Sequence, residues 1–196
     1  MRTSVLALAA AVAVVLAGAS TRADVIINDD FDANTTAPTY NYGYLGDTVT
    51  SAGVVAGAGT SGSNAFVLAF TPTTGGGAHG VGIGFNGVNL PSAAPTSLGD
   101  ITYSLDVKEA NPTGDVPMNL QFKYLAPDGT LGGPTDGNLD ALLEVHIPFT
   151  YDGATGGFQH FSGSLSGATP VTGDLATVQA NFGSLSLVQL HIARDW

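Results

Sequence analysis

The stretch Ile101–Lys108 reads Ile-Thr-Tyr-Ser-Leu-Asp-Val-Lys, in which apolar and polar residues alternate without a break. The stretch Met118–Tyr124 reads Met-Asn-Leu-Gln-Phe-Lys-Tyr and alternates in the same way. Successive side chains of a β-strand point to opposite faces, so the pattern predicts two strands with one face in the core and one in water. The residues expected to face inward are Ile101, Tyr103, Leu105 and Val107 in the first strand and Leu120, Phe122 and Tyr124 in the second.

Strand patterns of this kind recur along the chain, whereas helix signals are scarce. The 196 residues include 27 Gly and 10 Pro, which disfavour helices, and turn sequences such as Pro127-Asp128-Gly129 separate the apolar stretches. Further strands are expected at residues 25–27, 65–71, 80–85, 142–149, 159–165 and 185–192, a loop or weak edge strand at 51–63, and a short helical turn at 174–182 that Asp174 could cap. This spacing predicts an all-β protein, an antiparallel β-sandwich.

The first 23 residues have the features of an export signal. Arg2 supplies a positive start, Val5–Leu16 is apolar throughout, and Ala17-Gly18-Ala19 and Thr21-Arg22-Ala23 offer small residues for cleavage. The apolar run is shorter than the roughly 20 residues that a membrane span requires, and no later segment approaches that length. We therefore predict a signal peptide at 1–23 and one domain at 24–196, secreted or held at the cell surface.

The charge balance excludes several partners. The chain has five Lys and Arg against 16 Asp and Glu, a formal net charge of −11. Because Arg2 and Arg22 belong to the predicted signal, the domain keeps only Lys108, Lys123 and Arg194 as cations. Too few cations remain to neutralise a phosphate backbone, so nucleic acid is not expected as a partner. The chain contains no Cys, which excludes disulfides and thiolate chemistry.

No motif points to an enzyme. The glycines of Gly82–Gly87 resemble a dinucleotide-binding pattern, but they lie in a predicted strand with no helix after it. The histidines at 146, 160 and 191 alternate with apolar residues and are expected on solvent faces of strands. Glu109 and Glu144 are the only glutamates, and no clustered carboxylate pair is visible. We expect no catalytic residues.

An acidic cluster follows the first predicted strand. It reads Asn28-Asp29-Asp30-Phe31-Asp32-Ala33-Asn34, and Asp30, Asp32 and Asn34 match the start of a calcium loop. Thr35 replaces the glycine that such a loop requires and Asn41 replaces its final glutamate, so an EF-hand is not expected. Asp30 and Asp32 are the candidate ligands of a structural calcium ion, and the alternative is a solvated acidic strand end.

Tyrosines form the candidate ligand surface. Tyr40, Tyr42 and Tyr44 alternate and should share one face of a strand, where their rings could stack on sugars. Trp196 is the single tryptophan and is the other candidate ligand residue. The alternative is that this row is divided between core and surface without a ligand.

Three segments resemble the jelly-roll carbohydrate-binding modules of the galactose-binding-like superfamily, found in bacterial exported proteins. Residues 25–32 (Val-Ile-Ile-Asn-Asp-Asp-Phe-Asp) are similar to their first strand, 98–107 to a central strand and 158–165 to a strand with spaced aromatics. The resemblance implies a jelly roll, glycan binding and a calcium ion held partly by Asp30 and Asp32. In contrast to those modules, no closing strand or sorting tail follows Asp195-Trp196, so we expect a frame truncated at its C-terminus. The alternative is that the fold closes without that strand, with residues 51–55 at the edge.

The expected function is that of a secreted, non-catalytic module that binds a glycan or another cell-surface polymer. One alternative is a structural or adhesive surface protein that binds no sugar. A second is a glycoside hydrolase with a sandwich fold, which would require paired carboxylates in a cleft. Because a fold alone does not fix a function, the site must decide among them.

Overall fold

The computed structural model describes residues 4–16, 24–29, 31–32, 40–44, 47–71, 80–87, 89–110 and 112–195. The elements are β1 (Ser4–Leu16), β2 (Asp24–Asp29), β3 (Tyr40–Tyr44), β4 (Thr48–Val55), η1 (Thr60–Gly62), β5 (Ala65–Thr71), β6 (Gly80–Asn86), η2 (Leu98–Asp100), β7 (Ile101–Glu109), β8 (Val116–Ala126), β9 (Asp140–Tyr151), β10 (Gln159–Ser164), β11 (Pro170–Gly173), α1 (Leu175–Ala180), η3 (Phe182–Ser184) and β12 (Leu187–Asp195). None of the described helices is long and apolar enough to cross a membrane.

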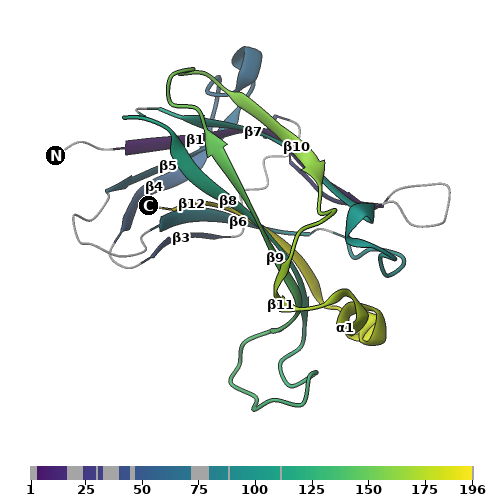
Figure 1. Cartoon of the computed structure of the whole chain (residues 1–196). Helices are drawn as coiled ribbons and strands as arrows, with labels where there is room; N and C mark the ends of the chain where they lie inside the picture. Colours follow the sequence, from purple (N-terminus) through teal and green to yellow (C-terminus); the bar gives the residue numbers. More distant parts are fainter. Residues whose placement is uncertain are drawn as a thin grey trace.

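The described strands form two six-stranded antiparallel sheets (Figure 1). Sheet A has the order β10-β7-β1-β5-β4, with β2 paired to β1. Sheet B has the order β11-β9-β8-β12-β6-β3. Neighbouring strands are often far apart in sequence, as β12 is from β6, so both sheets are held by long-range pairing.

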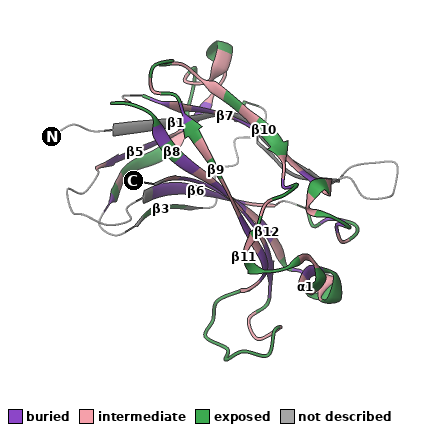
Figure 2. Ribbon diagram, viewed as in Figure 1, coloured by how far each residue is buried: buried purple, intermediate pink, exposed green. Residues whose placement is uncertain are grey.

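The core lies between the two sheets, and buried residues follow the strands that face it (Figure 2). Ile101, Leu105 and Val107 are buried in β7, and Tyr103 is half-buried against the core. The three residues predicted to face inward from the second strand, Leu120, Phe122 and Tyr124, are buried in β8. The alternation in the sequence therefore gave the correct register of both strands, because a slip of one residue would have exchanged their faces.

The remaining predicted elements are found close to their expected positions. Asp174 caps α1, since its Oδ1 accepts a hydrogen bond of 2.6 Å from the backbone N–H of Thr177. The segment expected as a loop or weak edge strand, 51–63, contains the second half of β4, which lies at the edge of sheet A, and η1. The last strand was predicted at residues 185–192, whereas β12 begins at Leu187 and ends at Asp195. It extends further because its final residues pair with β6 and β8.

The segment predicted as a signal peptide has a place in the fold. β1 pairs with β7 on one side, and with both β5 and β2 on the other. It is therefore a central strand of sheet A (Figure 1) and the strand to which β2 is paired. Removal of this segment by a signal peptidase, the extent of the mature domain and the truncation of the frame stay predictions.

Candidate functional site

The pairing of the strands of sheet B places polar residues side by side on its outer face. One row across the strands is formed by Asn86, Gln189, Lys123 and Glu144, which are register partners from β6 to β9. The next row is formed by Tyr40, Gly84, His191, Gln121 and His146, from β3 to β9. Residues that alternate along a strand with the core residues share the opposite face, so both rows belong to one surface, here called the polar face.

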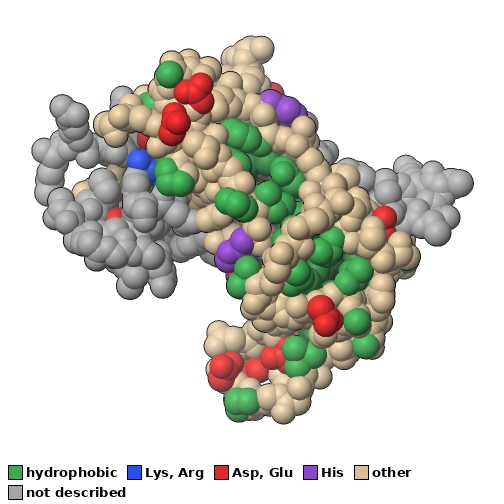
Figure 3. Space-filling model, viewed as in Figure 1, with side chains coloured by type: hydrophobic (Ala, Val, Ile, Leu, Met, Phe, Trp, Pro, Cys, Tyr) green, Lys and Arg blue, Asp and Glu red, His purple; other side chains and the backbone are tan. Residues whose placement is uncertain are grey.

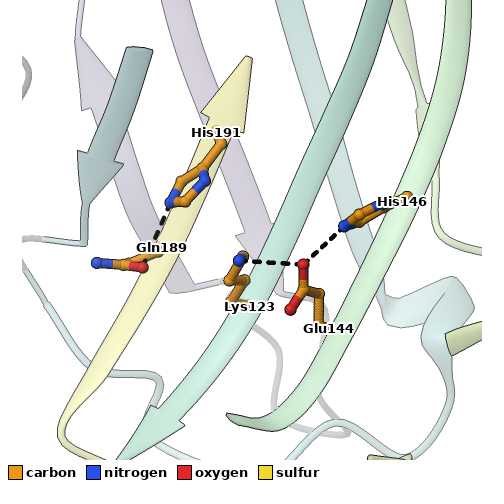
Figure 4. A network of polar contacts seen from close by, with 5 residues as sticks. All are labelled: Lys123, Glu144, His146, Gln189 and His191. Atoms are coloured by element: carbon orange, nitrogen blue, oxygen red, sulfur yellow. Dashed lines mark hydrogen bonds and ion pairs between the residues drawn. The ribbon is translucent and has the colours of Figure 1, made fainter. Parts of the chain in front are cut away.

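Two separate groups of hydrogen bonds lie on the polar face, one between β8 and β9 and one within β12 (Figure 4). The carboxylate of Glu144 accepts from Lys123 Nζ at 3.0 Å and from His146 Nε2 at 2.6 Å, both through Oε1. On β12, His191 Nε2 lies 3.3 Å from Gln189 Oε1. The amide of Gln189 links this second group to β6 by donating to Asn86 Oδ1 at 2.9 Å.

Glu144 is an ionised member of this network. Burial by itself raises the pKa of its carboxyl, but the hydrogen bonds from His146 and Lys123 outweigh that effect and hold the pKa below its usual value. The carboxylate charge is balanced by Lys123 beside it. The polar face is therefore rich in hydrogen-bonding groups and carries little net charge.

His191 departs from the expectation that it would be solvated. It lies on the polar face, but only 7 % of its surface is exposed. Burial and the neighbouring charge of Lys123 lower the pKa of His191 to about 4, against the opposing effect of Glu144. At neutral pH its imidazole is therefore uncharged. His146 and His160 are on solvent-facing positions, as predicted.

The depressed pKa of His191 predicts a specific dependence of stability on pH. Between pH 6.5 and 4 the unfolded chain binds a proton at this residue and the folded chain does not, so the free energy of unfolding should fall as the pH is lowered, by up to about 3 kcal/mol. Urea unfolding at several pH values measures the slope. His191→Gln should flatten the slope in this window. An unchanged slope in that variant would contradict the assignment, and His146→Gln is the matched control because its imidazole lies on the same face.

The backbone positions of the predicted tyrosine row align with this surface. β3 pairs with β6 so that Tyr40, Tyr42 and Tyr44 are register partners of the three glycines at 84, 82 and 80. Their backbone positions therefore continue the rows that contain His191 and Ala193. Trp196, the other predicted ligand residue, lies outside the described residues, as does Asp30.

The glycines of β6 help to shape the polar face. They alternate with Val81, Ile83 and Phe85, which are buried in the core. On the polar face this strand therefore has no side chains at positions 80, 82 and 84. The sequence pattern was correctly interpreted as strand glycines that permit close packing. It did not reveal that they separate the tyrosine positions from the histidine of β12.

A hollow lies at one end of the polar face. It has a volume of about 460 Å³ and is lined by Lys123, Glu144 and Gln189 on the strands. Gly137, Asn138 and Leu139 of the β8–β9 connection form its other wall. Sequence reasoning missed this hollow because it depends on how a connection of no regular pattern folds over the sheet.

Two residues of the acidic cluster, Phe31 and Asp32, are described and make contacts within the fold. Phe31 is fully buried and packs near Phe66 and Phe85, with ring centroids 6.3 and 6.4 Å away. Asp32 is exposed, and its Oδ1 accepts a hydrogen bond of 2.7 Å from the backbone N–H of Asn64. Within the described part of the chain no group of three or more His, Cys, Asp or Glu is placed to hold a metal. Calcium binding at Asp30 and Asp32 stays a prediction.

The two glutamates do not form a catalytic pair. Glu144 lies on the polar face, whereas Glu109 is buried in the core, where Arg194 Nη1 lies 3.3 Å from its Oε2. An inverting or retaining glycosidase requires two carboxyl groups facing the same bond. This pair therefore gives the hydrolase alternative no support.

Two antiparallel sheets packed around one core form a β-sandwich, and the structural comparison identifies it as a jelly roll. Among solved structures, the chain is similar to the family 11 carbohydrate-binding module from Clostridium thermocellum, which was determined in complex with a β-1,3-1,4-mixed-linked tetrasaccharide. The TM-score is 0.52 at 14 % identity, and the match covers 94 % of this chain and 88 % of that one. No protein-family profile and no curated protein matches the sequence.

Proposed function

We propose that the protein is a secreted, non-catalytic module that binds a polysaccharide on the polar face of sheet B. The observation that carries the proposal is the register of β3, which aligns the tyrosine positions with a surface of amide and imidazole groups. Sugar-binding surfaces need the same two components, since aromatic rings stack on sugar rings and polar groups bond to their hydroxyls. Export with residues 4–16 kept in sheet A would bring the module to extracellular glycans.

The chemistry of the polar face favours a neutral glycan. Gln121, Gln189 and Asn119 offer amides that both donate and accept hydrogen bonds. The one cation on the face, Lys123, is paired with Glu144, and His191 is uncharged at neutral pH. A uronate or sulfate group would find no unbalanced positive charge among these residues.

The rows suggest the direction of the ligand. A row crosses all strands from β3 to β9, a distance of about 20 Å at the usual strand spacing. Several sugar rings in line could contact successive strands over that length. The ligand of the structural neighbour, a β-1,3-1,4-mixed-linked tetrasaccharide, is the first oligosaccharide to test.

Binding should depend on the tyrosine row. Affinity electrophoresis and calorimetry with neutral β-glucans, mannans and xylans should identify a ligand for the chain 1–196. Tyr42→Ala should then weaken binding about five- to tenfold through loss of ring stacking, and Tyr42→Phe should retain most of it. Thr102→Ala, on the outer face of sheet A, is the control for surface mutation. Retention of no glycan by the wild type would instead favour the structural or adhesive alternative.

A further inference from the structure

Besides the hollow on the polar face, the molecule has a cavity at one end of sheet A. Its volume is about 590 Å³, and its walls come from the β4–β5 connection, the end of β7 and the residues before β10. The lining residues include Val55, Val67, Thr60, Ser61, Lys108 and Phe158. Apolar walls and a single cation are thus combined in one cavity.

The charge of Lys108 distinguishes this cavity. Of the cations in the described residues, Lys123 and Arg194 each lie within 4 Å of a glutamate, and Lys108 has no such ion pair. Its Nζ lies 5.7 Å from the centroid of the Phe158 ring instead. Acidic side chains are scattered over the face seen in Figure 3 and basic ones are few there, and the sequence has five Lys and Arg against 16 Asp and Glu, so an accessible cation in a cavity is unusual for this chain.

The wall opposite Lys108 is held by hydrogen bonds. The backbone N–H of Gly59 donates to Ser63 O at 2.7 Å, and Ser63 Oγ donates to Thr60 O at 2.8 Å. Ser61 has a left-handed backbone (φ 54°), which is unfavourable for a residue other than glycine. Strained backbone of this kind persists where the surrounding structure holds it in place, and it recurs at binding sites.

We propose that this cavity binds a small organic carboxylate, with the carboxylate at Lys108 and the body of the ligand against Phe158 and the two valines. A uronic acid and a simple organic acid share this chemistry. The site is independent of the polar face, since the residues of the two surfaces do not overlap. A glycan with acidic branches could therefore be held by both surfaces at once.

Titration of ¹⁵N-labelled chain 1–196 with sodium glucuronate, sodium acetate and glucose tests the proposal. Glucuronate should shift the amide resonances of Gly57, Gly59 and Gly157 and leave those of β8 and β12 in place. Acetate shifting the same amides with similar affinity would indicate a general carboxylate site, and glucuronate alone would indicate a uronate site. Glucose should shift none of these amides. Equal shifts with glucose and glucuronate would overturn the role of charge.

Two variants separate the charge from the cavity. Lys108→Met should weaken glucuronate binding at least about tenfold, because it removes a charge-assisted contact. Gly157→Val should block the cavity, because Gly157 is one of its lining residues. The fold should tolerate this substitution, because a Cβ at Gly157 meets only Thr155 O, at 4.0 Å. Gly133→Val is its control, because a Cβ there meets nothing within 4 Å. Unchanged affinity in Lys108→Met would overturn the proposal, whereas loss of polysaccharide binding in Tyr42→Ala alone concerns the polar face.

Discussion

A chain that begins at Asp24 should show no cooperative thermal transition, whereas the chain 1–196 should unfold in a single step. The reason is the position of β1 between β5 and β7. Without it, the hydrogen-bonding groups of both strands lose their partners in the middle of sheet A. Phe66, Leu68 and Phe70 of β5 and Leu105 and Val107 of β7 are buried beside that position and would gain access to water. The free energy lost with these hydrogen bonds and buried side chains exceeds the free energy of unfolding of an ordinary domain.

Calorimetry of the two chains measures the effect, and a third variant isolates its cause. A specific protease site placed between residues 19 and 20 lets the segment be cut while it remains in the sheet. The cut protein should keep its transition, and refolding after the segment has been separated should abolish it. Adding back the peptide 4–16, with lysines for solubility, should restore it. A chain from Asp24 as stable as 1–196 would show that sheet A closes without β1. Mass spectrometry of the exported protein then shows which form the cell makes.

Breaking the buried ion pair between the sheets should be the most destabilising single substitution. Glu109 of β7 is fully buried, and Arg194 of β12 is 11 % exposed, so each charge depends on the other. Arg194 also lies over the ring of Phe70, 5.3 Å from its centroid. Removing one partner leaves an uncompensated charge in the core, which typically costs about 3–5 kcal/mol. In a protein of this size Glu109→Gln should lower Tm by roughly 10 °C.

The double variant tests whether the pair acts as a unit. Glu109→Gln with Arg194→Met removes both charges and should cost less than the sum of the two single substitutions. Thermal melts of the four proteins give the interaction energy. Asp47 is also buried and acts on Arg194, so Asp47→Asn is a useful comparison and should have a smaller effect. Additive costs in the double variant would mean that the two side chains contribute separately.

Period-2 patterns predicted much of this fold because they depend on local geometry. β7 and β8 were recovered with the correct faces, and Asp174 was recognised as a cap because capping involves residues three positions apart. The pairing of β12 with β6 could not be read in the same way. It joins residues about 100 positions apart, and no alternation in either strand specifies the other.

The candidate site shows the same limit. Tyr40, Tyr42 and Tyr44 were identified as a row, yet their alignment with His191 depends on the register of three strands. His191 was expected in solvent because its neighbours in sequence are apolar. His191 is buried by residues of the neighbouring strands on the same face. Alternation along β12 alone cannot predict which residues those are. The predicted strand ended at Lys108, so neither the burial of Glu109 at the end of β7 nor its pairing with Arg194 was foreseen.

The place of β1 also affects the order in which the protein can form. This strand is synthesised first, but its two main neighbours end at Thr71 and Glu109. At roughly 5–20 residues per second, a nascent chain needs several seconds after Leu16 before β7 is complete. During that interval residues 4–16 lack their partner on the β7 side and are accessible to a receptor that binds apolar segments. Capture for export and incorporation into sheet A thus compete for the same segment. The rate of translation determines how long the segment is available for capture before β7 is complete.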